Sequence, residues 1–138
     1  GVADRIKERW TRSDSATVDL LMQWAGEAMD RKEWPAAQDF LDQVVVLKPG
    51  FAEGWNRRAT MHYLAGNLPK SMADIERTLS LEPRHFGALS GMAAIFMDIG
   101  KKEQALAAYR RVLEVYPQLR EAQQQVGVLE DELTGSRI

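Results

Sequence analysis

The chain has 138 residues, of which 45% are hydrophobic, and its 18 lysines and arginines against 20 acidic residues give a net charge of -2. This length suits one domain or one short array of repeats, and the nearly balanced charge argues against a nucleic-acid partner or attraction to an anionic membrane. The absence of cysteine excludes disulfides, a thiol nucleophile and thiolate metal sites, and no apolar run approaches the 18 residues that insertion across a membrane requires.

The predicted elements follow a 34-residue register, because Pro49, Pro83 and Pro117 are each 34 residues apart and each closes a short apolar run. In this register small residues coincide with small ones and large with large. The coinciding sets include Ala25, Ala59 and Ala93; Ala37, Ser71 and Ala105; and Leu41, Ile75 and Tyr109. We therefore divide the chain into a leading segment 1–17, three copies at 18–51, 52–85 and 86–119, and a trailing segment 120–138.

The leading segment contains a predicted capping helix. When the register is continued backwards, Ala3 and Trp10 take the positions of the second helix of an earlier copy, and Ile6 falls on the same face. Residues 2–12 are therefore expected to cover the first copy.

Each copy is predicted to form two helices. In the second copy Trp55, Ala59 and Tyr63 follow a 3.6-residue period, and a second apolar period starts after the turn at residues 65–67. The paired small residues, such as Ala59 and Ser71, are expected where the two helices of a pair cross, since larger side chains there would separate the backbones.

The turn inside each copy has its own signals. Gly66 and Gly100 suit the left-handed conformation that commonly ends a helix, although the first copy carries Lys32 at this position. Pro35 and Pro69 suit the first turn of the following helix, where a missing N–H costs nothing.

The trailing segment places Val126, Leu129 and Leu133 on one stripe of a predicted helix. This helix is expected to cover the last copy as a C-terminal cap. A coiled-coil seam that joins two chains is the alternative interpretation of the same stripe.

These features together resemble the tetratricopeptide repeat (TPR), a 34-residue helix-turn-helix unit with small and large residues at set positions and a closing proline. The residues that carry the resemblance best are Trp55, Ala59, Ser71, Ile75 and Pro83, and then Leu89, Ala93, Ala105, Tyr109 and Pro117. The resemblance covers 102 of the 138 residues. It implies an all-α fold, a right-handed α-solenoid of three helix-turn-helix TPR units with N- and C-terminal capping helices.

Two residues of the second copy depart from the family pattern. Arg58 stands where the repeat usually has leucine, and His62 stands where it usually has tyrosine. A guanidinium among apolar residues requires a partner, and Asp74 on the second helix of the same copy is the expected one. His62 is expected to be a half-buried packing residue.

Nothing in the sequence indicates catalysis, a metal site or a cofactor. The chain lacks the HExxH, GxSxG and GxGxxG patterns. His85 falls in the corner between the second and third copies, where we expect it to cap or pack against the next helix. Acidic residues such as Asp42 and Glu130 are interpreted as parts of solvated helix faces.

The resemblance also implies a binding site, because the first helices of TPR pairs line a concave groove. The groove residues predicted for peptide binding are Met22, Gly26, Met29, Asn56, Arg57, Thr60, Tyr63, Ser90, Ala94 and Met97. TPR proteins that clamp a carboxylate have lysine and asparagine where this chain has Met22 and Gly26, so we do not expect a clamp. The methionines suit an adaptable binding surface, and the alternative is that they belong partly to the core.

The sequence therefore predicts a non-catalytic scaffold that binds a peptide or a helix of another protein. The alternative is a self-assembly module that joins identical chains through the C-terminal helix or the groove. We expect a monomer, with a homodimer left open. The stretch WTRSDSATVDLL resembles the segment before the repeats in small bacterial TPR proteins made with a secretion signal. This resemblance implies a periplasmic location, and a cytoplasmic one stays open.

Overall fold

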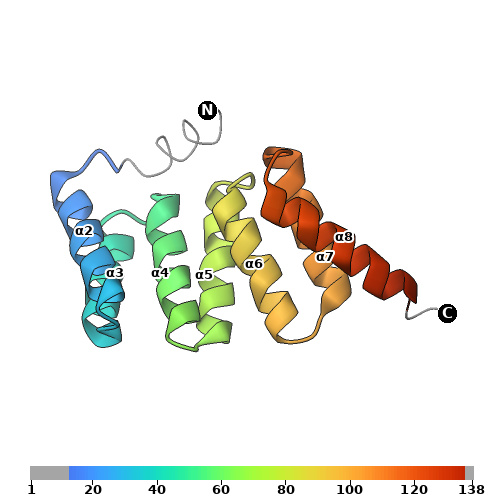
Figure 1. Cartoon of the computed structure of the whole chain (residues 1–138). Coiled ribbons are helices and arrows are strands. Elements are labelled where there is room, and N and C mark those ends of the chain that lie inside the picture. The colour runs from blue at the N-terminus through green and yellow to red at the C-terminus, as the bar shows by residue number, and fades with distance from the viewer. Residues whose placement is uncertain (1–12, 136–138) are drawn as a thin grey trace. The chain divides into compact units, whose positions relative to one another are not determined.

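The computed structural model describes residues 13–135, and the regular structure in that range consists of seven α-helices without any strand. They are α2 (Ala16–Asp30), α3 (Trp34–Leu47), α4 (Ala52–Leu64), α5 (Leu68–Leu81), α6 (Phe86–Asp98), α7 (Lys102–Val115) and α8 (Arg120–Gly135). The chain divides into two compact units, the first ending at Glu82 and the second starting at Pro83 (Figure 1). The capping helix expected at residues 2–12 lies outside the described residues.

The first unit contains two antiparallel helix pairs, α2 with α3 and α4 with α5, and α3 also packs against α4 (Figure 1). One core cluster contains Ala25, Ala37, Leu41 and Met61, which are at most 1% exposed. In the second pair the Ser71 hydroxyl donates a hydrogen bond of 2.7 Å to the Ala59 carbonyl oxygen. The helices approach this closely because both crossing residues are small, as the sequence predicted.

The second unit contains the pair α6 and α7, and α8 packs against α7. The crossing residues Ala93 and Ala105 are fully buried. On α8, Leu129 is fully buried while its neighbour Val128 remains 49% exposed. Glu130 of α8 accepts a hydrogen bond of 3.0 Å from Arg110 of α7. The sequence interpretation of Glu130 as merely solvated was therefore incomplete, because packing of α8 brings a cation within reach.

The start of α8 repeats the geometry at the start of α4. The Trp55 indole N–H donates to the Pro49 carbonyl oxygen at 2.8 Å, and the Gln123 amide donates to the Pro117 carbonyl oxygen at 2.7 Å. The two contacts are 68 residues apart, which is twice the repeat length. The helix α8 thus stands in the register of a first helix.

Hydrogen bonds from side chains begin several of the helices. Asn67 accepts from the Lys70 N–H at 3.2 Å at the start of α5, and Pro69 occupies the first turn of that helix. His85, only 3% exposed, accepts through Nδ1 from the Ala88 N–H at 3.1 Å at the start of α6. The expectation that His85 caps the next helix is confirmed, because its ring replaces the missing backbone partner there.

The same turn closes the first helix of each copy. The residues at its left-handed position are Lys32, Gly66 and Gly100, with φ values of 58°, 86° and 77°. The following N–H groups, such as that of Asn67 to the His62 oxygen at 2.8 Å, complete the closing hydrogen bonds. Lys32 is thus held in a conformation that glycine adopts without steric cost.

We expect Lys32→Gly to stabilise the protein by about 1 kcal/mol, because the left-handed conformation costs a residue with a Cβ atom that much. Gly66→Lys at the equivalent position should destabilise it by a similar amount, and it serves as the matched reverse variant. Urea unfolding of both variants measures the difference. A lower stability of Lys32→Gly would show that the lysine side chain makes contacts that outweigh its backbone strain.

No helix within residues 13–135 is long and apolar enough to cross a membrane.

Candidate partner-binding surface

Seven of the ten predicted groove residues lie on α2 and α4 of the first unit. We call this the α2–α4 surface; it consists of Met22, Gly26, Met29, Asn56, Arg57, Thr60 and Tyr63. A direct contact joins its two helices, because a Cβ atom on Gly26 would lie 3.3 Å from an outer guanidinium nitrogen of Arg57. Gly26 therefore leaves the space that the Arg57 side chain occupies. A larger residue at position 26 would push this cation away from α2.

The side chains of the α2–α4 surface are mostly half-buried. Met22 and Met29 pack against the core cluster that contains Ala25 and Leu41. The interpretation of the methionines as partly core residues therefore holds for these two. Their remaining area, together with the half-buried ring of Tyr63, is the apolar part of the surface.

The polar groups of this surface are already oriented. The Thr60 hydroxyl donates to the Asn56 carbonyl oxygen at 3.1 Å, and the Asn56 amide lies 3.4 Å from a carboxylate oxygen of Glu53. These contacts leave the Thr60 hydroxyl oxygen and the Asn56 side-chain oxygen with lone pairs to accept further hydrogen bonds.

The other three predicted residues, Ser90, Ala94 and Met97, lie on α6 in the second unit and are also half-buried. We call them the α6 surface. Small side chains dominate it, so that the helix backbone stays accessible to a close neighbour.

A polar cluster beside the α2–α4 surface explains the unusual Arg58. Its guanidinium makes two hydrogen bonds to Asp74, at 2.8 and 2.9 Å, and a third to Asp42 at 3.1 Å. The expected pairing of Arg58 with Asp74 is confirmed. The hydrogen bond to Asp74 is the main cause that raises the pKa of Arg58, against the opposing effect of burial. The side chain of Asp74 is 6% exposed, whereas that of Asp42 is 46% exposed.

Sequence reasoning missed Asp42, which it placed on a solvated face. The available signal was the spacing, since Asp42, Arg58 and Asp74 are 16 residues apart in turn. The indole of Trp55 completes the cluster, with the guanidinium carbons of Arg58 and Arg77 at 5.0 and 5.5 Å from its ring centre. These two cation–π contacts hold the arginines against α4.

His62 belongs to the same cluster and is only 6% exposed. The expectation that it is half-buried was therefore wrong in degree, because α5 covers the imidazole that Asp74 approaches at 3.8 Å. Burial lowers the pKa of His62, and the charges of Arg58 and Lys70 add to this effect against the attraction of Asp74. Its ring therefore favours the neutral form. Among residues 13–135, no group of three or more His, Cys, Asp or Glu side chains could hold a metal ion.

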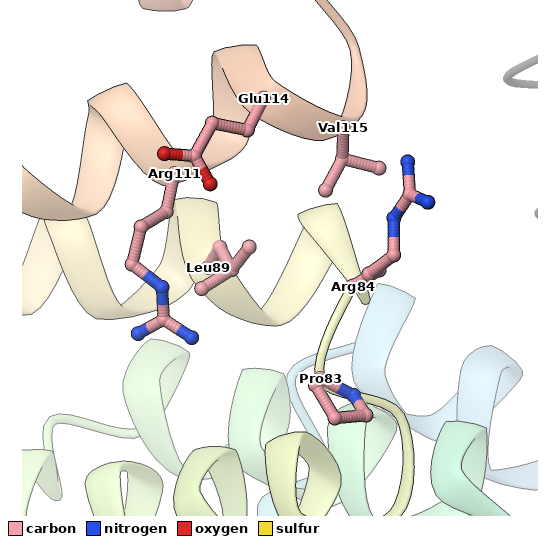
Figure 2. A pocket seen from close by; sticks show the side chains of 6 residues that line it. All are labelled: Pro83, Arg84, Leu89, Arg111, Glu114 and Val115. Atoms are coloured by element: carbon pink, nitrogen blue, oxygen red, sulfur yellow. The ribbon is translucent and has the colours of Figure 1, made fainter.

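A pocket of about 370 Å³ lies in the second unit between the start of α6 and the end of α7. Its lining residues are Pro83, Arg84, Leu89, Arg111, Glu114 and Val115, and Figure 2 shows the two arginines on opposite sides of Leu89. No residue of the α2–α4 surface or the α6 surface takes part. Exposed charged side chains form half of the lining, whereas ligand sites are mostly apolar. The pocket is therefore separate from the predicted binding surface and less suited to a small ligand.

The paired helices and their shared turn geometry define a TPR domain, a protein–protein interaction module. No family model matches the chain. It is 53% identical over 136 residues to a TPR repeat-containing protein of Rhizobium etli, covering 99% of this chain and 67% of that protein. The chain therefore belongs to the TPR repeat-containing proteins. It is also 26% identical over 160 residues to the outer membrane protein assembly factor BamD of Caulobacter vibrioides, covering 51% of that protein.

Solved structures share the fold. The Sgt2 TPR domain from Aspergillus fumigatus has a TM-score of 0.79 at 20% identity, over 89% of this chain and 83% of that domain. The first TPR of Spaghetti (RPAP3), bound to the HSP90 peptide SRMEEVD, has a TM-score of 0.80 at 20% identity, over 87% of this chain and 95% of that one. At these identities the likeness concerns the fold.

Proposed function

We propose that this protein is a non-catalytic scaffold that binds an extended or helical segment of another protein on the α2–α4 surface and the α6 surface. The observation that carries the proposal is the contact of Arg57 with the space above Gly26, since it joins α2 and α4 into one binding surface. Support also comes from the Spaghetti (RPAP3) structure, in which a TPR of the same fold holds a peptide, and from the complex of yeast Sti1 TPR2B with pHsp70.

The chemistry of the α2–α4 surface indicates the kind of segment. Thr60 and Asn56 offer acceptors to a peptide backbone, and the ring of Tyr63 offers a rigid contact of the kind enriched at binding hot spots. Arg57 supplies a cation for an acidic side chain of the partner. With Gly26 and the methionines beside these groups, one or two apolar anchors and one acidic residue are the expected features of the ligand.

Self-assembly stays the alternative proposal, through α8 or the α2–α4 surface. The burial of Leu129 within its own unit argues against α8 as the seam. A periplasmic location stays a prediction that depends on the leading segment alone.

Tyr63→Ala is expected to weaken binding by about 1 kcal/mol or more, roughly fivefold in Kd, because it removes the aromatic anchor. The probe is a set of 12-residue peptides selected from an unbiased displayed library against the full chain, with affinities measured by calorimetry. Val46→Ala is the apolar control, since Val46 on α3 is 77% exposed. Thermal unfolding should be nearly unchanged in both variants.

Arg57→Ala should chiefly reduce the salt dependence of binding, since one partly exposed charge contributes more to steering than to affinity. Arg110→Ala, on the second helix α7, is its matched control. Equal losses in Tyr63→Ala and Val46→Ala, or in Arg57→Ala and Arg110→Ala, would move the binding site off the α2–α4 surface. Selection of no peptide at all would contradict the peptide-binding proposal.

A further inference from the structure

An apolar face of α2 is left uncovered by the described residues. Leu20 and Trp24 lie one turn apart on α2 and are 42% and 41% exposed. The Trp24 ring lies 5.7 Å from that of Phe40 on α3, which extends the apolar face to the second helix. In Figure 1, α2 and α3 stand at the end of the first unit away from α5. We call Leu20, Trp24 and Phe40 the end face.

Later copies show what normally covers this face. Gly54 stands 34 residues after Leu20, and a Cβ atom on it would lie only 2.7 Å from a methyl group of Val44. Ala122 stands 102 residues after Leu20 and is 1% exposed on α8, which packs against α7. In both cases the position is covered by the second helix of the preceding pair.

We propose that residues 2–12 of this chain form the helix that covers the end face. In the repeat register Trp10 coincides with Val44, Thr78 and Val112, each of which is fully buried on a second helix. Trp10 therefore occupies the register position that faces Leu20. Ile6 coincides with Phe40, and so falls on the face that turns toward α2 and Trp24.

The start of the described chain fixes where this segment begins. Ser13 is 3% exposed, its hydroxyl donates to Asp19 of α2, and its carbonyl oxygen accepts from Lys48 just after α3. A helix over residues 2–12 would be about 16 Å long at 1.5 Å per residue. Leu20 and Trp24 lie about 6 and 12 Å from the start of α2 on the same scale. A helix that runs back along α2 therefore reaches both residues.

The side chains of the end face set how this helix packs. Leu20 and Trp24 are larger than the glycine and alanine of the later copies, so that the helix lies farther from α2 than α3 lies from α4. The tryptophan at position 10 fills this wider gap, where valine or threonine stands in the other second helices. A tethered segment also has an effective concentration near millimolar, which favours it over a second copy of the chain as the occupant.

Cross-linking tests the proposal in the full chain, which has no natural cysteine. The test pair is Asp4→Cys with Glu27→Cys, on the outer side of α2, and the control pair is Asp4→Cys with Met29→Cys, on the opposite side. The probe is a short bis-maleimide, and mass spectrometry separates intrachain from interchain products. Rates are normalised to the labelling rate of each single cysteine. We expect the test pair to cross-link within one chain at least tenfold faster than the control pair.

Adding Trp10→Ala to the test pair should lower its rate at least fivefold, because the contact with Leu20 is lost. This arm separates docking from the mere closeness of positions 4 and 27 in the sequence. Equal rates for the two pairs, or no effect of Trp10→Ala, would overturn the proposal. Products that are mainly interchain would assign the end face to a second copy and also overturn it.

Discussion

Asp74→Ala should destabilise the protein by about 3 kcal/mol, which is the scale expected when a buried charge loses its partner. The carboxylate of Asp74 is 6% exposed and makes both of the short hydrogen bonds that hold the Arg58 guanidinium. Without it, Arg58 keeps only the half-exposed Asp42. Urea unfolding at neutral pH measures the loss.

Two further variants make this prediction specific. Asp42→Ala removes the other carboxylate from the same arginine and should cost less than about 1 kcal/mol, because a solvent-exposed ion pair contributes little. Arg58→Leu in the Asp74→Ala background should recover much of the loss, since it removes the uncompensated guanidinium. A loss below about 0.5 kcal/mol in Asp74→Ala would mean that the Arg58 side chain extends to water.

Leu129→Ala is the second large effect, with an expected loss of about 3 kcal/mol from the transfer of a buried leucine and the cavity that it leaves. Leu129 is fully buried where α8 packs against α7. Val128→Ala, one residue away and 49% exposed, should change stability by less than about 0.5 kcal/mol.

Unfolding of Leu129→Ala at two protein concentrations separates the cap from the coiled-coil alternative. A cap within one chain predicts the same loss at both concentrations. A seam between two chains predicts a loss that depends on concentration, because dimer formation would then contribute to stability by mass action. The second result would show that α8 is an oligomerisation helix.

The predicted binding residues are a different case from the fold. The register that the family resemblance supplies places Met22, Gly26 and Asn56 on first helices, and the structure puts them on α2 and α4. Their role in binding stays a prediction, since no partner chemistry is written into the repeat pattern. Partner recognition depends on which half-buried side chains remain accessible, and the repeat leaves those positions free to vary.

The sequence by itself determined the paired helices and their turns. Pro69 at a first turn, Gly66 at a left-handed position and the small residues Ala59 and Ser71 act through local backbone geometry and helical period, and these are legible over a few residues. The 34-residue repetition then showed that each copy has the same structure, so that one well-read copy explained the others.

Only the tertiary structure decided which residues meet across helices. Equivalent positions hold Trp24 against Phe40 in the first copy and Arg58 against Asp74 in the second. The third partner, Asp42, reaches Arg58 from the preceding pair. The depth of His62 and the contact of Arg57 above Gly26 have the same origin, because burial and contact between helices depend on how close the packed side chains let them approach.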